Sequence, residues 1–249
     1  GQYINYDSSI AERITIEDIK SKEGMNKQTR IDFALRSPDL FESKKIVIRK
    51  TGDSLIGCID ENNFYFDTLV HGIYSTTENY SLEPLLAILN SKPATLFYRL
   101  LHDIKGKVFA KISLDNLGSF PLPSSMLEYS IDLTEKTNSL LAKQTSIVKE
   151  IQQFNELLAN KFDSVQFNSK LLNWYMLESK EFLKELSKQK IQLNLAEESQ
   201  WIQYFKEEKC KIQKSKNEIE NIENEIDQIV YELYGLTEEE IKIVEGMNS

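Results

Sequence analysis

Histidine, cysteine and glycine-rich loops are scarce in this sequence of 249 residues. The two histidines, His71 and His102, stand outside any motif, so we expect structural or surface roles for both. Two cysteines, Cys58 and Cys210, are too few for a disulfide framework or a zinc site, which fits a reducing cytoplasm. No glycine-rich loop follows a strand as nucleotide binding requires. We therefore expect no catalytic residue, no metal site and no cofactor site in this chain.

Long hydrophobic runs and an initiator methionine are also missing. No apolar run approaches the ~20 residues needed to span a bilayer, so no membrane partner is expected. The chain opens with Gly1-Gln2-Tyr3 and no signal pattern, which indicates a fragment of a longer protein. Pro38-Asp39 and Glu42-Ser43-Lys44 superficially match a nuclease core, but they are too close together for separate strands that converge on a metal.

Acidic residues outnumber basic ones, giving a net charge of −9, but the excess is unevenly distributed. Residues 1–123 hold 15 Lys and Arg against 16 Asp and Glu, so nearly all of the excess lies in residues 124–249. Lys20–Lys50 holds nine basic and four acidic residues, and Lys92–Lys111 holds five basic residues and one acid. The face presented to a partner decides binding, so the overall charge does not exclude nucleic acid.

Two regions with different periodicity meet near Pro121–Pro123, which predicts an α+β domain over 1–123 and a helical bundle with coiled-coil-like seams over 124–249. Four apolar segments in the first region predict an antiparallel meander: Lys45–Arg49, Ser54–Ile59, Phe64–Phe66 and Leu69–Tyr74. Helices are expected after Ser81, as N-cap, and after Pro93, and a short strand over Lys111–Leu114.

The second region has no proline and no glycine before Gly235. Apolar residues recur every seven positions in two long segments, and a helix between them is expected over about Ser169–Lys190. Polar residues interrupt both seams, which favours a short antiparallel bundle over a long rod. The seam positions are Leu133, Leu140, Ile147 and Phe154 in the first helix and Phe205, Ile212, Ile219, Ile226 and Leu233 in the last. Gly235 should end the last helix, and Thr237 should cap one more turn.

Three segments together resemble a known family. Lys44–Gly52, followed by Asn63–Asp67, resembles the opening of the TaqI-like C-terminal specificity domain, and Leu85–Lys92, then Phe120–Pro123, resembles its helix and closing turn. Glu225–Thr237 is similar to the end of large combined restriction-methylation enzymes.

The resemblance implies a bacterial DNA target-recognition domain of a restriction-modification adenine methyltransferase. An N-terminal domain would bind S-adenosylmethionine and methylate adenine, and in some members a nuclease domain precedes it. The Asn/Asp-Pro-Pro-aromatic loop that grips the flipped base in such enzymes is missing here. This chain would therefore hold double-stranded DNA while the catalytic domain flips the base.

Basic residues near the matched segments are the candidates for DNA contact. They are Lys44, Lys45, Arg49, Lys50, Lys105, Lys107 and Lys111. If the first strand alternates, Ile46 and Ile48 pack inward and Lys45 and Arg49 point outward. Two alternatives stay open: half of a type I restriction specificity subunit, and a helical adaptor that binds only protein.

Overall fold

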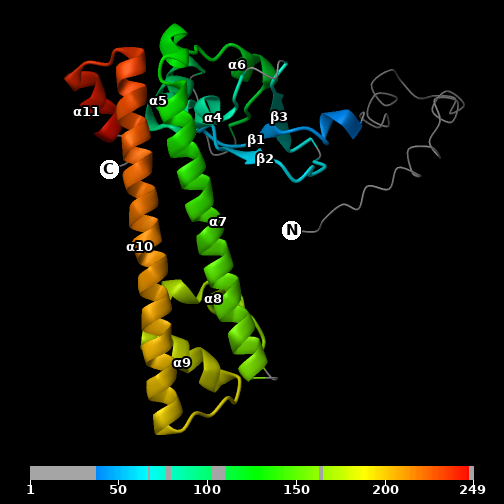
Figure 1. Ribbon diagram of the computed structural model, residues 1–249, viewed down its shortest axis with the longest axis vertical. Coiled ribbons are helices and arrows are strands. Elements are labelled where there is room, and N and C mark those ends of the chain that lie inside the picture. Colours follow the sequence, from blue (N-terminus) through cyan, green and yellow to red (C-terminus); the bar gives the residue numbers. More distant parts are fainter. Residues whose placement is uncertain (1–37, 67, 77–79, 103–109, 163–164, 247–249) are drawn as a thin grey trace, which may run out of the picture. The chain divides into compact units, whose positions relative to one another are not determined.

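The computed structural model describes residues 38–66, 68–76, 80–102, 110–162 and 165–246. These residues fall into two compact units. One runs to Asn90 and resumes at Ala94–Leu122, and the other comprises Ser91–Pro93 and the residues from Pro123 on. A small sheet comes first in the chain and long helices follow it, which confirms the α+β class (Figure 1).

The sheet of the first unit has its first strand in the centre. Its strands are β1 (Lys45–Arg49), β2 (Gly57–Asp60) and β3 (Val70–Tyr74). Their order is β2-β1-β3, and β1 pairs antiparallel with both neighbours. The predicted meander is wrong in this respect, because β3 returns to the open edge of β1 instead of pairing with β2.

The predicted strand over Phe64–Phe66 is also wrong, because the chain turns at the end of β2. The Asp60 carboxylate accepts hydrogen bonds from the backbone N–H of Asn62, at 2.8 Å, and of Phe64, at 2.9 Å. Asn63 has a φ of 56°, a left-handed conformation that asparagine tolerates. This turn diverts the aromatic residues that follow away from the ladder.

One face of β1 packs against helix α4 (Glu83–Asn90). Ile46 and Ile48 are fully buried on this face, as predicted. A Cβ built on Gly57 of the neighbouring strand would lie 3.0 Å from Ile48 and 3.3 Å from Leu86 of α4. The helix therefore lies directly on the sheet.

The other elements of the first unit depart from two predictions. Helix α5 (Lys92–Leu101) forms as expected, but α4 starts two residues after Ser81, whose hydroxyl donates to the Glu83 side chain. The strand expected over Lys111–Leu114 is a single bridge between Lys111 and Thr51. Ser113 instead caps helix α6 (Leu114–Gly118) by accepting from the Asn116 N–H. A short 3-10 turn lies at Pro38–Leu40, and another at Ser124–Leu127 lies near the start of the second unit's main segment.

The second unit is built on two long antiparallel helices, α7 (Ser130–Lys161) and α10 (Leu195–Tyr234) (Figure 1). Between them in sequence lie α8 (Ser169–Leu172), a 3-10 turn at Trp174–Met176, and α9 (Ser179–Lys188). The continuous helix predicted over 169–190 is therefore wrong. Leu177 is extended, with ψ 156°, and a capping box between Glu178 and Glu181 starts α9 afresh.

The predicted seams form the interface of the long helices. Phe205, Ile212 and Ile226 are buried, and Ile219 is partly buried against the core that contains Phe205 and Ile212. Gly235 ends α10 in the left-handed conformation, with φ 63°. Thr237 precedes α11 (Glu238–Gly246) and exchanges hydrogen bonds with Glu240, as predicted.

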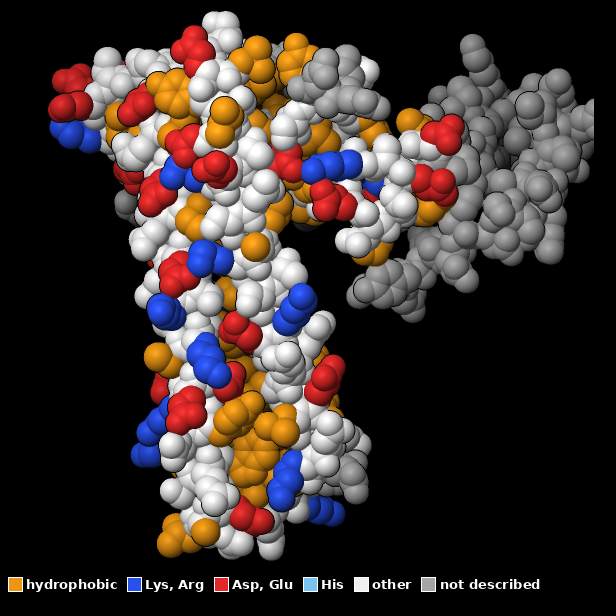
Figure 2. Space-filling model, viewed as in Figure 1, with side chains coloured by type: hydrophobic (Ala, Val, Ile, Leu, Met, Phe, Trp, Pro, Cys, Tyr) orange, Lys and Arg blue, Asp and Glu red, His pale blue; other side chains and the backbone are white. Residues whose placement is uncertain are grey.

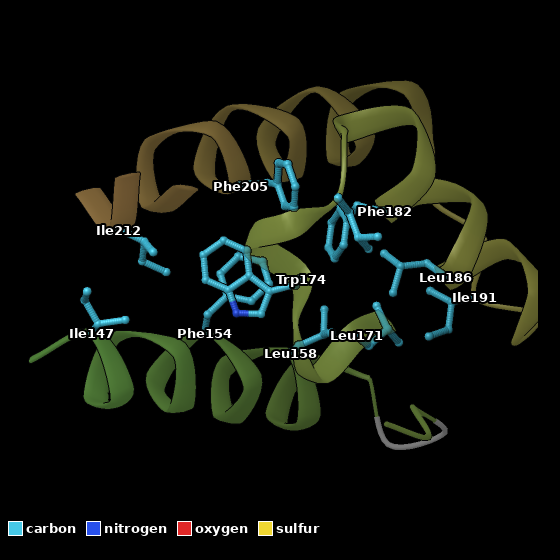
Figure 3. Packing of buried hydrophobic residues seen from close by; sticks show 11 residues of the cluster. Ile147, Phe154, Leu158, Leu171, Trp174, Phe182, Leu186, Ile191, Phe205 and Ile212 are labelled. Carbon is cyan, nitrogen blue, oxygen red and sulfur yellow. The ribbon is translucent and has the colours of Figure 1, made fainter. Parts of the chain in front are cut away.

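An aromatic core joins these helices to the segment between them (Figure 3). The Phe154 ring of α7 stacks on Trp174 with centroids 3.8 Å apart. Phe182 of α9 stacks on Phe205 of α10 at 4.8 Å. The segment 169–188 thus packs between the C-terminal end of α7 and the N-terminal end of α10.

Candidate nucleic-acid interface

Lys45 is buried and not available to a ligand, so the prediction that it points outward is wrong. Its side chain has no exposed surface, and its Nζ lies 2.6 Å from Asp60 Oδ2 and 2.5 Å from the Phe41 carbonyl oxygen. Phe41 in turn stacks on Tyr65, with centroids 4.5 Å apart, and meets Phe66 edge-on. Aromatic residues from outside the strands cover this end of β1. Lys45 is therefore enclosed, and its charge is paired with that of Asp60 inside the unit.

Lys44 lies at the surface but is engaged by two acids. Its Nζ is 2.8 Å from the Glu61 carboxylate and 2.5 Å from that of Glu83. Burial acts to lower the pKa of Lys44, but the hydrogen bonds and charges of both acids outweigh it and raise that pKa. The charge of Lys44 is therefore largely balanced within the unit.

The turn after β1 is fixed by backbone hydrogen bonds on two sides. Lys50 N–H donates to the Leu69 carbonyl at 2.8 Å, just before β3. Lys50 carbonyl accepts from Ile112 N–H at 2.8 Å, and Gly52 N–H donates to the Ala110 carbonyl at 2.9 Å. Because each of these bonds joins distant parts of the sequence, the turn is a rigid platform for the side chains that it carries.

A contact of the buried His71 side chain also holds this turn in place. Its ring Nε2 lies 2.7 Å from the Ile112 carbonyl oxygen, and the side chain is buried. The histidine thus ties β3 to the segment that carries Lys111. This is the structural role expected for His71, but no sequence pattern identifies Ile112 as its partner.

The acid in this turn, Asp53, is paired with Arg99 of α5. The Arg99 Nη2 lies 2.8 Å from Asp53 Oδ2, and its Nε donates to the Asp53 carbonyl at 3.2 Å. Sequence reasoning missed Arg99, because no pattern links residues 46 positions apart. The pair removes a negative charge that would otherwise offset the neighbouring basic residues.

Three candidates lie on this turn, and we call them the basic turn: Arg49, Lys50 and Lys111. Arg49 and Lys111 are exposed and Lys50 is half-buried. Within the part of the chain that the structure describes, none of the three forms an ion pair. Lys105 and Lys107 lie outside the described residues, so their predicted role stays a prediction. A cationic group on a fixed backbone suits phosphate and base contacts of duplex DNA.

Residues 3–122 match the TaqI-like C-terminal specificity domain. This part of the chain is similar to that family throughout its length. Residues 127–230 match a domain of unknown function (DUF8810). A search of curated proteins finds no match. The TaqI-like domain contains the whole basic turn, and the second matched region covers α7, α8, α9 and most of α10. The family is a specificity domain, so its part in an enzyme is recognition and not catalysis.

Other kinds of site find no support in the described residues. Among them, no group of three or more His, Cys, Asp and Glu side chains could hold a metal ion. None of the helices that the structure describes is both long enough and apolar enough to cross a bilayer. Cys58 and Cys210 are exposed free thiols.

The visible face of the helical unit carries acidic and basic side chains interspersed (Figure 2). Lys136 pairs with Glu225 at 2.7 Å and Lys209 with Glu178 at 2.8 Å. Lys136 and Lys209 therefore have acidic partners, in contrast to the residues of the basic turn, although acids outnumber bases in residues 124–249.

Proposed function

We propose that this chain recognises a specific sequence in duplex DNA for a bacterial restriction-modification methyltransferase that modifies adenine. An S-adenosylmethionine-dependent catalytic domain, N-terminal to this region in the parent protein, flips and methylates the base. The TaqI-like unit holds the duplex in register during that step. In this proposal the chain itself performs no chemistry and acts in the cytoplasm.

The observation that carries the proposal is the basic turn, set in a specificity domain. Arg49, Lys50 and Lys111 keep their charges free of acidic partners among the described residues, whereas Lys44, Lys92 and Arg99 are all paired. A cationic side chain kept free at the surface gains most from releasing counterions from DNA phosphates. The turn's backbone bonds hold these residues in place before DNA arrives.

Salt dependence of DNA binding tests the proposal directly. The complete chain and a Lys50→Ala/Lys111→Ala variant are titrated against a fluorescent duplex at several salt concentrations. We expect nonspecific-range affinity for the parent chain, with a dissociation constant of about 10⁻⁴ to 10⁻⁶ M. Each lost phosphate contact should reduce the slope of log affinity against log salt by about 0.9, so the double variant should lose about twice that.

A matched control changes two exposed lysines of the helical unit, Lys149→Ala/Lys214→Ala. It alters net charge by the same amount but leaves the basic turn intact, and its salt slope should equal that of the parent chain. Equal losses in both double variants would show that total charge, and not the basic turn, governs binding. Absence of any duplex binding at low salt would overturn the proposed function.

A further inference from the structure

The guanidinium group of Arg49 is held flat over the backbone of its own turn. A Cβ built on Gly52 would lie 2.7 Å from Arg49 Nη2, 2.8 Å from Cζ and 2.9 Å from Nε. Three bonded atoms at nearly equal distance place this Cβ position over the plane of the group and not at its edge. Gly52 also has a φ of 138°, which side-chain-bearing residues rarely adopt. The backbone conformation therefore favours glycine here, and a Cβ at this position would displace the Arg49 guanidinium from its place over the turn.

A second contact fixes the rotation of the group within that plane. Arg49 Nη2 donates to Ser54 Oγ at 2.8 Å. Nη2 carries two hydrogens, one beside Nη1 and one beside Nε. If Ser54 accepts the hydrogen beside Nη1, the other Nη2 hydrogen and the Nε hydrogen remain as a pair of adjacent donors. If it accepts the hydrogen beside Nε, the other Nη2 hydrogen and one Nη1 hydrogen remain as such a pair. No carboxylate among the described residues takes that pair.

We propose that Arg49 is the residue of this domain that reads a guanine, through a bidentate contact to O6 and N7 in the major groove. The inference rests on the proposed function and deepens it. Lys50 and Lys111 contribute affinity through phosphates, and Arg49 contributes base preference. Gly52 and Ser54 are positioning residues, because they act only through Arg49.

The restraint on Arg49 favours a base over a phosphate. A phosphate contact needs positive charge and tolerates a mobile side chain, as lysine contacts show. A bidentate contact to guanine needs two parallel donors in a fixed plane, and arginine supplies that fork. Holding the group in advance reduces the side-chain freedom lost on binding. Within the described residues, the Arg49 side chain is held by Ser54, whereas neither lysine of the basic turn forms an ion pair.

Selection from a pool of duplexes with random sequence tests the assignment. The parent chain should enrich sequences with an invariant G·C pair at one position. Arg49→Lys keeps the charge but lacks the fork, and its preference for guanine at that position should fall by about ten-fold or more. Gly52→Ala should cause the same loss, since its Cβ displaces the guanidinium. Lys50→Ala should weaken binding to all sequences and leave the base preference unchanged.

The outcomes separate this inference from the function on which it rests. An unchanged guanine preference in Arg49→Lys overturns the inference alone. Parent binding that depends on salt but enriches no base overturns both the inference and the proposed recognition of a specific sequence, and leaves only nonspecific DNA binding. Arg49→Ala that weakens all sequences by one factor makes Arg49 a phosphate contact, and the inference is again wrong. Failure of the parent chain to bind DNA overturns both. Circular dichroism shows whether Gly52→Ala folds; if it does not, Arg49→Lys decides the test with the turn intact.

Discussion

The buried pair of Lys45 and Asp60 contributes to the stability of the sheet and not to binding. Changing Lys45→Met would leave the Asp60 carboxylate buried without its cation, because the side chains of both residues are at most 3% exposed. Removing one partner of a buried pair costs about 3–5 kcal/mol of unfolding free energy, and we expect a loss of that order. Urea denaturation at neutral pH measures it.

Lys44→Met is the matched control, one residue away in the sequence. The Lys44 side chain is 43% exposed, and the buried carboxylate of Glu83 keeps its hydrogen bond from Ser81, so breaking the Lys44 pairs should cost less than the Lys45 change. Equal costs for the two variants would mean that the backbone N–H groups of Asn62 and Phe64 suffice to hold the Asp60 charge.

Glu83 should make the stability of the first unit depend on acid pH. Burial acts to raise the pKa of Glu83, but hydrogen bonds from Lys44, Ser81 and the backbone outweigh it and lower that pKa below 4.5. A carboxyl whose pKa is lower in the folded state stabilises the fold above its unfolded pKa, and this contribution is lost as the pH falls through the folded value. Urea midpoints of the parent chain should therefore fall below about pH 4.5, and those of Glu83→Gln should fall less. A steeper fall in the variant would contradict the direction of this shift.

The stability of the helical unit should depend on Phe154, which lies at the centre of its aromatic core. Phe154 contacts the rings of Trp174, Tyr204 and Phe205, and 1% of it is exposed. Phe154→Ala should cost about 3–5 kcal/mol, since the core closes only partly over the space left. Ile131→Ala lies on the same helix at 75% exposure and should change stability by less than about 0.5 kcal/mol. Thermal unfolding of both variants compares them, and a similar loss in each would show that α7 is not anchored at Phe154.

Elements whose residues are neighbours along the chain could be predicted from the sequence, and those that depend on distant partners could not. The seven-residue spacing of Phe205, Ile212 and Ile226 marks the buried face of α10 because helical periodicity is a local property. The alternation of β1 likewise placed Ile46 and Ile48 correctly. Lys45 shares the opposite face with Arg49, but alternation does not reveal that Phe41 and the residues after β2 return to cover it.

In the candidate site too, the sequence predicts which residues are candidates but not their partners in the fold. Arg49, Lys50 and Lys111 could be chosen from the sequence because they flank segments with strand-like patterns. The sequence does not show that Lys44 and Lys45, unlike these three, are paired with acids. That difference depends on the positions of Asp60, Glu61 and Glu83 in the folded chain. Arg99 and His71, which hold the turn in place, are joined to it only by folding.

At the scale of the whole molecule, the specificity-domain match and the first compact unit end at the same residue, Leu122, but three residues within the match belong to the other unit. The specificity-domain match continues from residue 3 to 122, but Ser91–Pro93 within it belong to the helical unit. Asp227 of α10 accepts from Lys92 N–H at 2.9 Å, and Lys92 Nζ lies 3.2 Å from the same carboxylate and 3.0 Å from Asn224 Oδ1. Helix α5 therefore begins in one unit and continues in the other.

This arrangement predicts that residues 1–122 alone are less stable than the same residues in the complete chain. Cutting there removes the partners of Lys92, and a hydrogen bond to a charged group contributes about 1.5–3 kcal/mol to stability. Hydrogen exchange of α4 and α5 should be faster in the fragment, and Lys92→Ala in the complete chain should reproduce part of that change. Lys143→Ala, which breaks a partly exposed pair with Glu218 between α7 and α10, should leave α5 unaffected. If exchange in α5 is the same in the fragment and in the complete chain, the specificity domain folds independently and the contacts of Lys92 contribute nothing to its stability.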